Sequence, residues 1–354
     1  MQRLAVGVLA SLLLSACLAG TAPPPQESGA MARAAPSEPS TGLPPLAPPV
    51  RVRAAYSVVS GGVAPYWLAA DQGLWQRHGL EVELSLISGA PVILSALLTG
   101  EVQFALASAD AALSIQAREP DVVAFMNISA ASVHRLIVAP DIERPEELRG
   151  RRIGVFTLGD GNYALMSKAL PKFGLNPDRD VIWTPVGGGN MGAFVTALAA
   201  GAIDAALLLP PTDLPAIKNG GRVLFNYRDL GLPYAGLPAY TLRRTLDSQR
   251  AVVEAFAAGV IDGVRLFKAE PSLGKDVLMR WANITDPEAV EWTYETYRQE
   301  GILTDRPFLD IASTRAVMEM LATEQPDLRQ VQFERSFDNS VVEALERRGY
   351  LSAR

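Results

Sequence analysis

The stretch RRIGVFTLGDGNY, residues 151–163, contains the features that decide the fold. Ile153 and Val155 are typical of a strand inside a sheet, and Gly159 and Gly161 allow a tight turn into a helix. The first N–H groups of such a helix have no partner within it, so they can hold an anion or the polar edge of a ligand. The same glycines are equally expected in a plain turn between a strand and a helix, where they serve only steric needs.

The same order of elements occurs earlier in the chain. Three pairs of segments share an offset of 101 positions: 51–56 with 152–157, 80–87 with 181–188, and 96–103 with 197–204. In a chain so rich in Ala and Leu a single match could be chance, but strand, helix, strand, helix, strand in one order twice predicts two similar α/β lobes.

The chain begins with the pattern of an exported lipoprotein. Arg3 gives a short positive start, the apolar run 4–14 is too short to cross a bilayer as a stable helix, and Leu14-Ser15-Ala16-Cys17 follows. This tetrapeptide resembles the lipobox of bacterial lipoproteins, which implies that residues 1–17 are the signal peptide and that lipid on Cys17 anchors the mature chain to a membrane. A plain secretory signal is the alternative. Because Cys17 is the only cysteine, no disulfide can form within one chain.

Residues 18–49 are rich in Pro, Ala, Ser, Gly and Thr and contain no aromatic residue. Such a composition cannot bury a core, and it predicts a disordered tether with an extended reach of about 100 Å. A proline-rich stretch can also be a recognition ligand, but a tether suits a lipid-anchored export better.

The remaining chain, about 300 residues, is long enough for two lobes with substantial cores. The whole sequence has a formal charge of −6, and no cluster of Arg and Lys with interleaved aromatic residues occurs, which argues against a nucleic-acid partner. No apolar run after the signal predicts a membrane span. Residues 193–211 come closest, but Asp204 and a change of period mark a helix followed by a strand.

Apolar patterns predict a series of strands, each followed by a turn and a helix. Besides the strand of the opening stretch, they cover residues 52–59, 80–87, 102–107, 122–128, 134–139, 181–186 and 205–209. The turns of the first lobe carry small or hydroxylated residues, namely Ser60, Ser88, Gly89, Ser108, Asp110 and Ser129. The turns after parallel strands open at one edge of a sheet, where open α/β sheets bind ligands. Taken singly, Ser108 and Asp110 are more typical of helix caps than of ligand contacts. From Leu246 onward the pattern is helical.

Several motifs carry a resemblance to a known family. They are YWLAADQGLW (66–75), HGLEVE (78–83), LLTGEVQFA (97–105), ELRGRRIGV (147–155) and GAIDAA (201–206). Together they resemble the substrate-binding proteins of nitrate, sulfonate, taurine and thiamine-pyrimidine ABC importers, over residues 50–297. Most of these motifs serve the scaffold and say little about the ligand.

The resemblance implies an α/β fold of the type 2 periplasmic binding protein kind, with mostly parallel sheets flanked by helices. Residues 50–131 plus 243–354 would form lobe 1 and residues 132–242 lobe 2, with a small solute held between them and delivered to a membrane permease. Carried over by position, the solute contacts fall on turns after strands: Ser60, Tyr66, Ser88, Gly89, Ser108, Ser129, Thr157, Asp160, Asn162, Gly188, Asn190 and Pro210.

Asp160 departs from the Ser/Thr-rich turn of family members that bind strong anions. Its charge would oppose an anion at that helix start, which favours a zwitterion, an amine-bearing heterocycle or a neutral solute over a sulfonate. We expect a monomeric protein of the cell envelope without a cofactor or a metal, since no His/Asp/Glu cluster has ligand spacing.

An enzyme and a sensor remain as other classes. Related enzymes on this fold, a pyrimidine synthase and a desulfinase, use a cysteine-rich iron motif or a cysteine nucleophile, and this chain offers only His78 and His134 as imidazole bases. His78 is expected to compensate a helix end, and His134 to lie at the surface or a hinge. A lipoprotein that binds a solute and signals to a membrane partner would use the same lobes.

Overall fold

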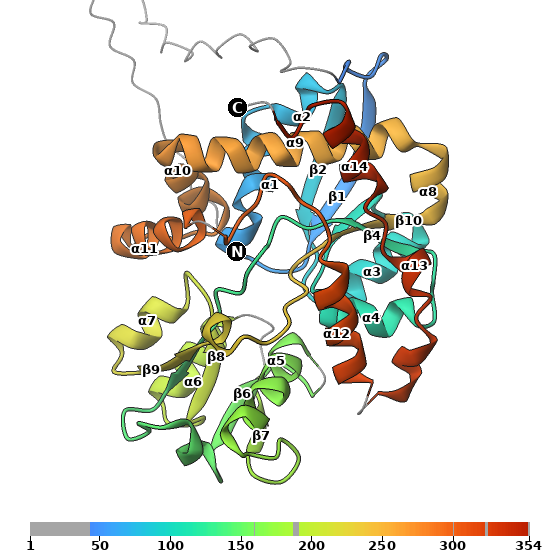
Figure 1. The fold of residues 1–354 in the computed structure, drawn as a ribbon. Coiled ribbons are helices and arrows are strands. Elements are labelled where there is room, and N and C mark those ends of the chain that lie inside the picture. Colours follow the sequence, from blue (N-terminus) through green and yellow to red (C-terminus); the bar gives the residue numbers. More distant parts are fainter. Residues whose placement is uncertain (1–42, 159, 187–190, 300, 323–324, 353–354) are drawn as a thin grey trace, which may run out of the picture. The chain divides into compact units, whose positions relative to one another are not determined.

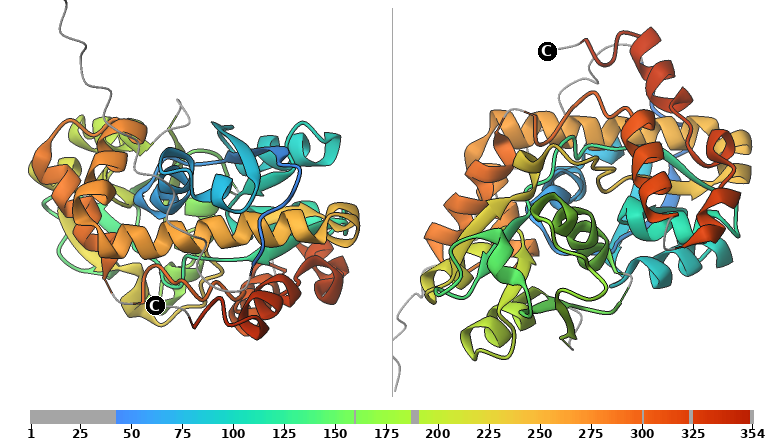
Figure 2. Two further views of the ribbon diagram at one scale, coloured as in Figure 1. Left: turned by 90° about the horizontal axis from the view of Figure 1, so that it is seen from above. Right: turned by 60° about the horizontal axis from the view of Figure 1, so that its bottom comes forward.

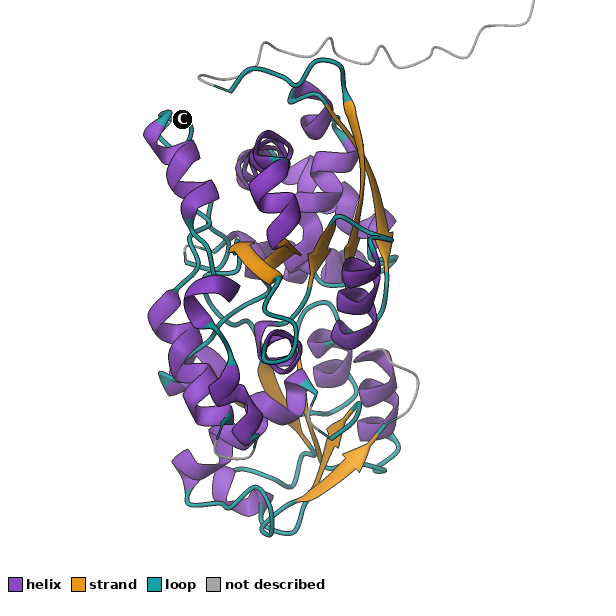
Figure 3. Ribbon diagram, turned by 90° about the vertical axis from the view of Figure 1, so that its right-hand side faces the viewer, coloured by secondary structure: helices purple, strands orange, loops and turns teal. Residues whose placement is uncertain are grey.

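A computed structural model describes residues 43–158, 160–186, 191–299, 301–322 and 325–352. These residues form two five-stranded sheets, each flanked by helices (Figures 1 and 3). The predicted signal peptide, Cys17 and most of the predicted tether lie outside the described residues. Among the helices of the described ranges, none combines the length and apolar character that a membrane span requires.

The first sheet has the strand order β2-β1-β3-β10-β4. Its strands are β1 (Val50–Tyr56), β2 (Leu80–Leu86), β3 (Phe104–Leu106), β4 (Val122–Met126) and β10 (Ala239–Leu242). β1 pairs in parallel with β2 and β3, whereas β10 runs antiparallel to β3 and β4. The carboxyl ends of four of the five strands therefore share one edge of this sheet.

The second sheet has the order β7-β6-β8-β5-β9. Its strands are β5 (Arg135–Val138), β6 (Arg152–Val155), β7 (Ile182–Pro185), β8 (Ala205–Leu208) and β9 (Arg222–Asn226). Only β5 runs against the other strands. The arrangement β7-β6-β8 matches β2-β1-β3, so the internal repeat predicted from the sequence is confirmed.

The helices follow the strands and then dominate the C-terminal part. They are α1 (Ala64–Asp71), α2 (Leu74–Arg77), α3 (Ala90–Thr99), α4 (Ala109–Gln116), α5 (Gly161–Ala169), α6 (Met191–Ala199), α7 (Asp213–Lys218), α8 (Arg243–Ser248), α9 (Arg250–Ala269), α10 (Pro271–Trp281), α11 (Pro287–Arg298), α12 (Ile311–Leu321), α13 (Phe333–Ser336) and α14 (Ser340–Arg347). Short 3-10 helices are η1 (Gly61–Val63), η2 (Pro145–Leu148), η3 (Leu170–Phe173), η4 (Tyr227–Leu230) and η5 (Pro326–Gln330).

Three details differ from the expectations from sequence. A single helix is expected after the first strand and its turn, over residues 65–77, where Pro65 suits the first helical turn and Gly79 follows the end. The structure has two helices there, because Gly73 adopts a left-handed conformation with φ 63° between them. β9 and β10 were not predicted. β10 hydrogen-bonds within the first sheet, although residues up to 242 were assigned to lobe 2, so the chain returns to the first sheet before residue 239.

The long helix α9, orange in Figure 2, contributes many residues to the main hydrophobic core of the first lobe. Glycines on α9 permit a close approach to α1 and α2, because a β-carbon on Gly263 would lie 2.1 Å from the Pro65 carbonyl oxygen and one on Gly259 2.2 Å from the Trp75 ring. Phe256 of the same helix stacks on Phe104 of β3, with ring centroids 4.0 Å apart. The helix is therefore fixed against both α1 and the sheet.

The sheet of the second lobe is covered on both faces. Leu165 and Leu170 belong to one buried cluster, and Phe194 and Ile203 to another. A β-carbon on Gly154 in β6 would lie only 2.7 Å from Ile203 Cδ1, so the glycine of the opening stretch is needed for close packing of the sheet.

Candidate functional site

Two turns of the first lobe that were predicted to contact solute lie together. Ser60, at the start of η1, and Ser129, after β4, flank Gly62, where a β-carbon would lie 3.5 Å and 3.9 Å from their hydroxyl oxygens. The Tyr297 side chain of α11 hydrogen-bonds Ser60; burial raises the pKa of Tyr297, and this hydrogen bond acts in the opposite direction. Strands β1 and β4 and helix α11 thus converge on one polar corner.

Turns of the two lobes meet at Ser108 and Gly161. Ser108 begins α4 and makes no capping hydrogen bond with its side chain. A β-carbon on Gly161, the first residue of α5, would lie 3.5 Å from Ser108 Oγ. The turn after β3 of the first sheet therefore contacts the helix that follows β6 of the second sheet.

Asp160 acts as the N-cap of α5. Its carboxylate accepts backbone hydrogen bonds from Tyr163 at 2.7 Å, from Phe156 at 2.6 Å and from Thr157 at 3.0 Å. The carboxylate therefore takes N–H groups that an anion at this helix start would need, and its charge is compensated within the turn. Asn162 is buried, and its Nδ2 donates to the Leu207 carbonyl at 3.2 Å.

The other predicted positions are more scattered. Ser88 and Gly89 are exposed after β2, and Pro210 is buried after β8. Tyr66 lies within the core cluster of the first lobe, where burial raises the pKa of its hydroxyl, which has no hydrogen-bond partner among the described residues. Gly188 and Asn190 lie outside the described residues. Exposed apolar side chains adjoin these turns: Leu86 at the end of β2, Val92 in α3 and Leu158 after β6.

Arg135 is a candidate that sequence reasoning missed. Because β5 is antiparallel, its first residue pairs with Leu208 at the carboxyl end of β8 and so lies at the edge where the turns open. The Arg135 guanidinium lies 4.9 Å from the Trp292 ring centroid and donates to Asp213, and 16% of the Arg135 side chain remains exposed. The sequence shows a lone arginine at a strand start, and only knowledge of strand direction places it at this edge.

Asp213 holds Arg135 in place. Its side chain is fully buried and accepts hydrogen bonds from Trp292 Nε1 at 3.1 and 3.2 Å and from the Leu214 backbone N–H at 2.9 Å. Burial raises the pKa of Asp213, while Arg135 and the hydrogen bond from Trp292 favour the ionised form. Since Trp292 lies on α11, this group also joins α7 of the second lobe to a helix packed on the first.

Asp110 lies in a cluster of polar side chains inside the protein. Lys168 Nζ lies 2.6 Å from Asp110 Oδ1, with side-chain exposures of 2% and 7%. His134, expected at the surface or a hinge, lies directly before β5 in the connection between the two sheets and is partly buried. Burial lowers the pKa of His134 to about 4 against the opposing influence of the Asp110 charge. Its Nδ1 lies 2.9 Å from Ser132 Oγ.

His78 closes α2, as expected, but it is also buried. Its Nε2 lies 3.0 Å from Asp262 Oδ2 and 3.2 Å from the Tyr350 hydroxyl, so it links α2, α9 and the C-terminal segment. Within the described ranges, no group of three or more His, Cys, Asp and Glu side chains could hold a metal ion.

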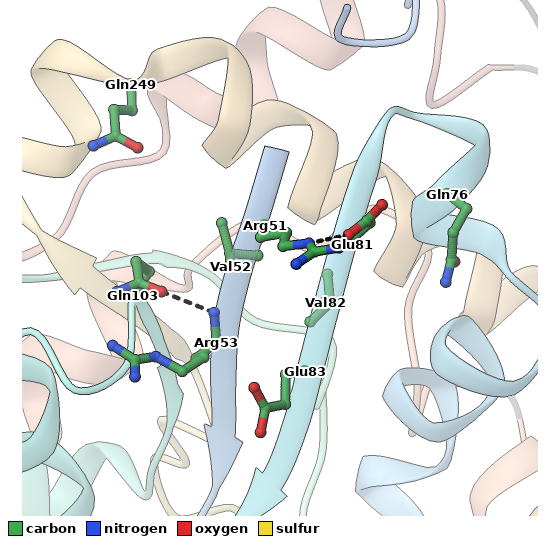
Figure 4. A pocket seen from close by; sticks show the side chains of 9 residues that line it. All are labelled: Arg51, Val52, Arg53, Gln76, Glu81, Val82, Glu83, Gln103 and Gln249. Carbon is green, nitrogen blue, oxygen red and sulfur yellow. Dashed lines mark hydrogen bonds and ion pairs between the residues drawn. The ribbon is translucent and has the colours of Figure 1, made fainter. Parts of the chain in front are cut away.

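A separate open groove of about 740 Å³ lies on the first sheet (Figure 4). It is lined by Arg51, Val52, Arg53, Gln76, Glu81, Val82, Glu83, Gln103 and Gln249. Arg51 pairs with Glu81, and Gln103 accepts from the Arg53 backbone N–H. Residues 51–53 and 81–83 of this lining belong to the amino-terminal halves of β1 and β2, so the groove lies at the end of the sheet opposite the polar turns.

Two α/β lobes with repeated strand order and polar turns at their facing edges define the periplasmic binding protein fold. Residues 61–273 match the model of the family described as NMT1/THI5 like, and the chain belongs to this family. It is 27% identical over 207 residues to the taurine-binding periplasmic protein of Escherichia coli K12, a match that covers 58% of this chain and 63% of that protein.

Solved structures agree on the fold. The alkanesulfonate-binding protein SsuA from Xanthomonas axonopodis pv. citri, bound to MOPS, has a TM-score of 0.68 at 20% identity over 82% of this chain and 99% of that chain. A desulfurization enzyme, DszB, has a TM-score of 0.63 at 14% identity over 84% of this chain and 99% of that chain. The same fold therefore carries both binding proteins and an enzyme.

Proposed function

We propose that this protein is the extracytoplasmic solute-binding component of an ABC-type importer, which captures a small polar organic solute between its lobes. The observation that carries this proposal is the meeting of Ser108 with Gly161, because it joins polar turns from both lobes at one place. Solutes held between two lobes are retained by closure of the lobes.

Arg135 and the hydroxyl-bearing turns suggest the chemistry of the solute. A guanidinium fixed by Asp213 and Trp292 suits an anionic group, whereas the N-terminus of α5 is already occupied by the Asp160 carboxylate. Exposed Leu86 and Leu158 suit a short apolar part. A zwitterionic organic acid such as taurine, the ligand in the name of the E. coli relative, combines these features. Taurine is a zwitterion, as expected from the sequence, but its anionic group is a sulfonate, which the sequence disfavoured because of Asp160. Arg135 offers this sulfonate a partner away from Asp160, whose charge is compensated within its own turn.

The remaining expectations are part of the same proposal. Besides Ser108 and Arg135, the proposed solute contacts are Ser60, Ser88, Gly89, Ser129, Thr157 and Asn162. Four further contacts are proposed on the sequence resemblance alone: Tyr66, Gly188, Asn190 and Pro210. Residues 50–131 plus 243–354 form one lobe and residues 132–242 the other, except that β10 belongs to the first sheet. Lipid on Cys17 would tether a monomer to the membrane beside its permease.

Isothermal titration of the purified protein with taurine, ethanesulfonate and ethanolamine tests the proposal. We expect saturable one-to-one binding of taurine, a higher melting temperature with bound solute, and no binding of ethanolamine, which lacks the anionic group. Native mass spectrometry of the protein as purified would detect any co-purifying solute. Failure of every organic anion to bind, with no solute retained, would contradict the proposal.

The fold shared with DszB makes an enzyme the competing function. Residues 50–354 contain no cysteine, so a cysteine nucleophile is not available in this part of the chain. Incubation of bound taurine with the protein should return it unchanged by mass spectrometry, whereas turnover would favour the enzyme. A solute sensor would bind equally well but would not support uptake in cells that carry the permease.

A further inference from the structure

Helices α4 and α5 contact each other through a face of α5 that begins with two small residues and ends with a lysine. Gly161, Ala164 and Lys168 follow one another at helical spacing on α5, and Ala164 is buried in the cluster that contains Ala112 and Leu113 of α4. Gly161 approaches Ser108 at the start of α4. Small side chains bring the two helices close, so water has little access to the contact.

The Asp110–Lys168 ion pair lies at this contact. Its two atoms are 2.6 Å apart and both side chains are almost completely buried. Charges removed from water are stable only when their pairing is good, and breaking such a pair leaves a buried charge without compensation. Separation of α4 from α5 therefore costs free energy until water reaches both groups.

Four titratable side chains lie near the pair. Asp110 influences the pKa of His134, Tyr227, Tyr234 and Tyr240, so all four lie within electrostatic reach of its carboxylate. The hydroxyls of Tyr227 and Tyr240 are buried without a hydrogen-bond partner among the described residues. These groups come from the segments that connect the two sheets and from β10, which places the pair beside the connections between the lobes.

Another contact between α7 and α11, made by Lys218, is exposed to solvent and serves as a comparison. Lys218 of α7 lies 3.0 Å from Asp286 and 2.6 Å from Glu288, beside and at the start of α11. All three side chains are largely exposed, with 42%, 49% and 66% of their surface open to solvent. Exposed pairs contribute little to stability. The two contacts thus join the same lobes with similar geometry but very different burial.

We propose that Asp110 and Lys168 are positioning residues for solute capture, which hold α4 against α5 and thereby the two lobes together. This inference rests on the proposed function, because it makes retention of the solute depend on the ion pair. The apparent affinity for a solute falls in proportion to the population of the competent arrangement. In the solute-bound protein the same pair opposes separation of the lobes, so its loss lets the lobes open and the solute leave faster. Neither residue needs to contact the solute.

Small-angle scattering of the solute-free protein tests the contact directly. We expect Lys168→Met to have a larger radius of gyration than the wild type at unchanged helical content, Lys168→Arg to restore it, and Lys218→Met to leave it unchanged. An unchanged radius in a folded Lys168→Met protein, or an equal increase in Lys218→Met, would overturn the proposal.

A designed cross-link covers the case in which Lys168→Met does not fold. Ser108→Cys and Gly161→Cys, in a chain carrying Cys17→Ser, would place two thiols at the α4–α5 contact. In the Asp110→Asn background, we expect a larger radius under reducing conditions and a return to the wild-type radius after oxidation. A radius that does not respond to oxidation of the formed disulfide contradicts the inference.

Stopped-flow measurement with taurine as the probe tests the role in capture. We expect Lys168→Met to weaken binding about tenfold or more through faster dissociation, with Lys168→Arg close to wild type. A loss that lies in the association rate alone would count against a holding role. If taurine does not bind the wild type, the proposed solute fails, while the scattering experiments still decide whether the ion pair holds the lobes.

Discussion

Replacement of Asp160 by Ala tests whether this residue is a helix cap or a solute contact. The substitution removes an acceptor for three backbone N–H groups, those of Phe156, Thr157 and Tyr163. A lost N-cap costs roughly 0.5–2 kcal/mol, and each further hydrogen bond roughly 0.5–1.5 kcal/mol. The expected loss of unfolding free energy is therefore about 3 kcal/mol.

Urea unfolding followed by circular dichroism measures this loss, and hydrogen exchange locates it. The amides of residues 156, 157 and 163 should lose protection while those of the first sheet keep theirs. Asp310→Ala is a matched control, because Asp310 caps α12 through the Ser313 backbone N–H at 2.9 Å, and its loss should cost about 1 kcal/mol. If Asp160→Ala keeps its stability and amide protection but loses taurine binding, the carboxylate contacts the solute and the assignment as a cap is wrong.

Three further predictions concern other parts of the molecule. Arg135→Gln should weaken taurine binding more than tenfold, while Arg222→Gln, on the exposed edge strand β9, should not, and equal affinity in both would remove Arg135 from the site. Gly263→Ala should destabilise the first lobe by about 3 kcal/mol, since its β-carbon would meet the Pro65 carbonyl, and a wild-type melting temperature would contradict this packing. Because burial lowers the pKa of His134 from 6.5 to about 4, the unfolded chain binds more protons between these values, and stability should fall by about 2 kcal/mol from pH 7.5 to 5. His134→Gln should reduce this slope in urea titrations, and an unchanged slope would refute the prediction.

The pattern of strands and turns was enough to predict the repeated lobes. The offset of 101 positions placed segments 51–56 and 152–157 in equivalent places, and β1 and β6 do occupy the same position in their sheets. Hydrophobic periodicity detects such elements because each strand and helix buries its own apolar face. It did not detect β10, whose four residues gain their role from pairing with β3 and β4, far away in the sequence.

The candidate site was harder to predict, because it too depends on contacts between residues that are far apart in the sequence. Ser60 and Ser108 were predicted as solute contacts because polar residues after parallel strands reach one edge of a sheet. Arg135 was not, because it precedes an antiparallel strand, and its place depends on strand direction. Asp160 was recognised as a charge at a helix start, but only the three hydrogen bonds to its carboxylate show that the charge is satisfied within the turn.

The position of β10 has a consequence for the order of assembly. The second sheet is built from one continuous segment, so all its strand pairs can form as soon as β9 has been synthesised. The first sheet is completed later, because β10 lies between β3 and β4 and follows all strands of the second sheet in the sequence. Until then β3 and β4 have unpaired edges, which are prone to association with other chains. The second sheet can therefore be complete before the first, in which β3 and β4 are the last strands to be joined.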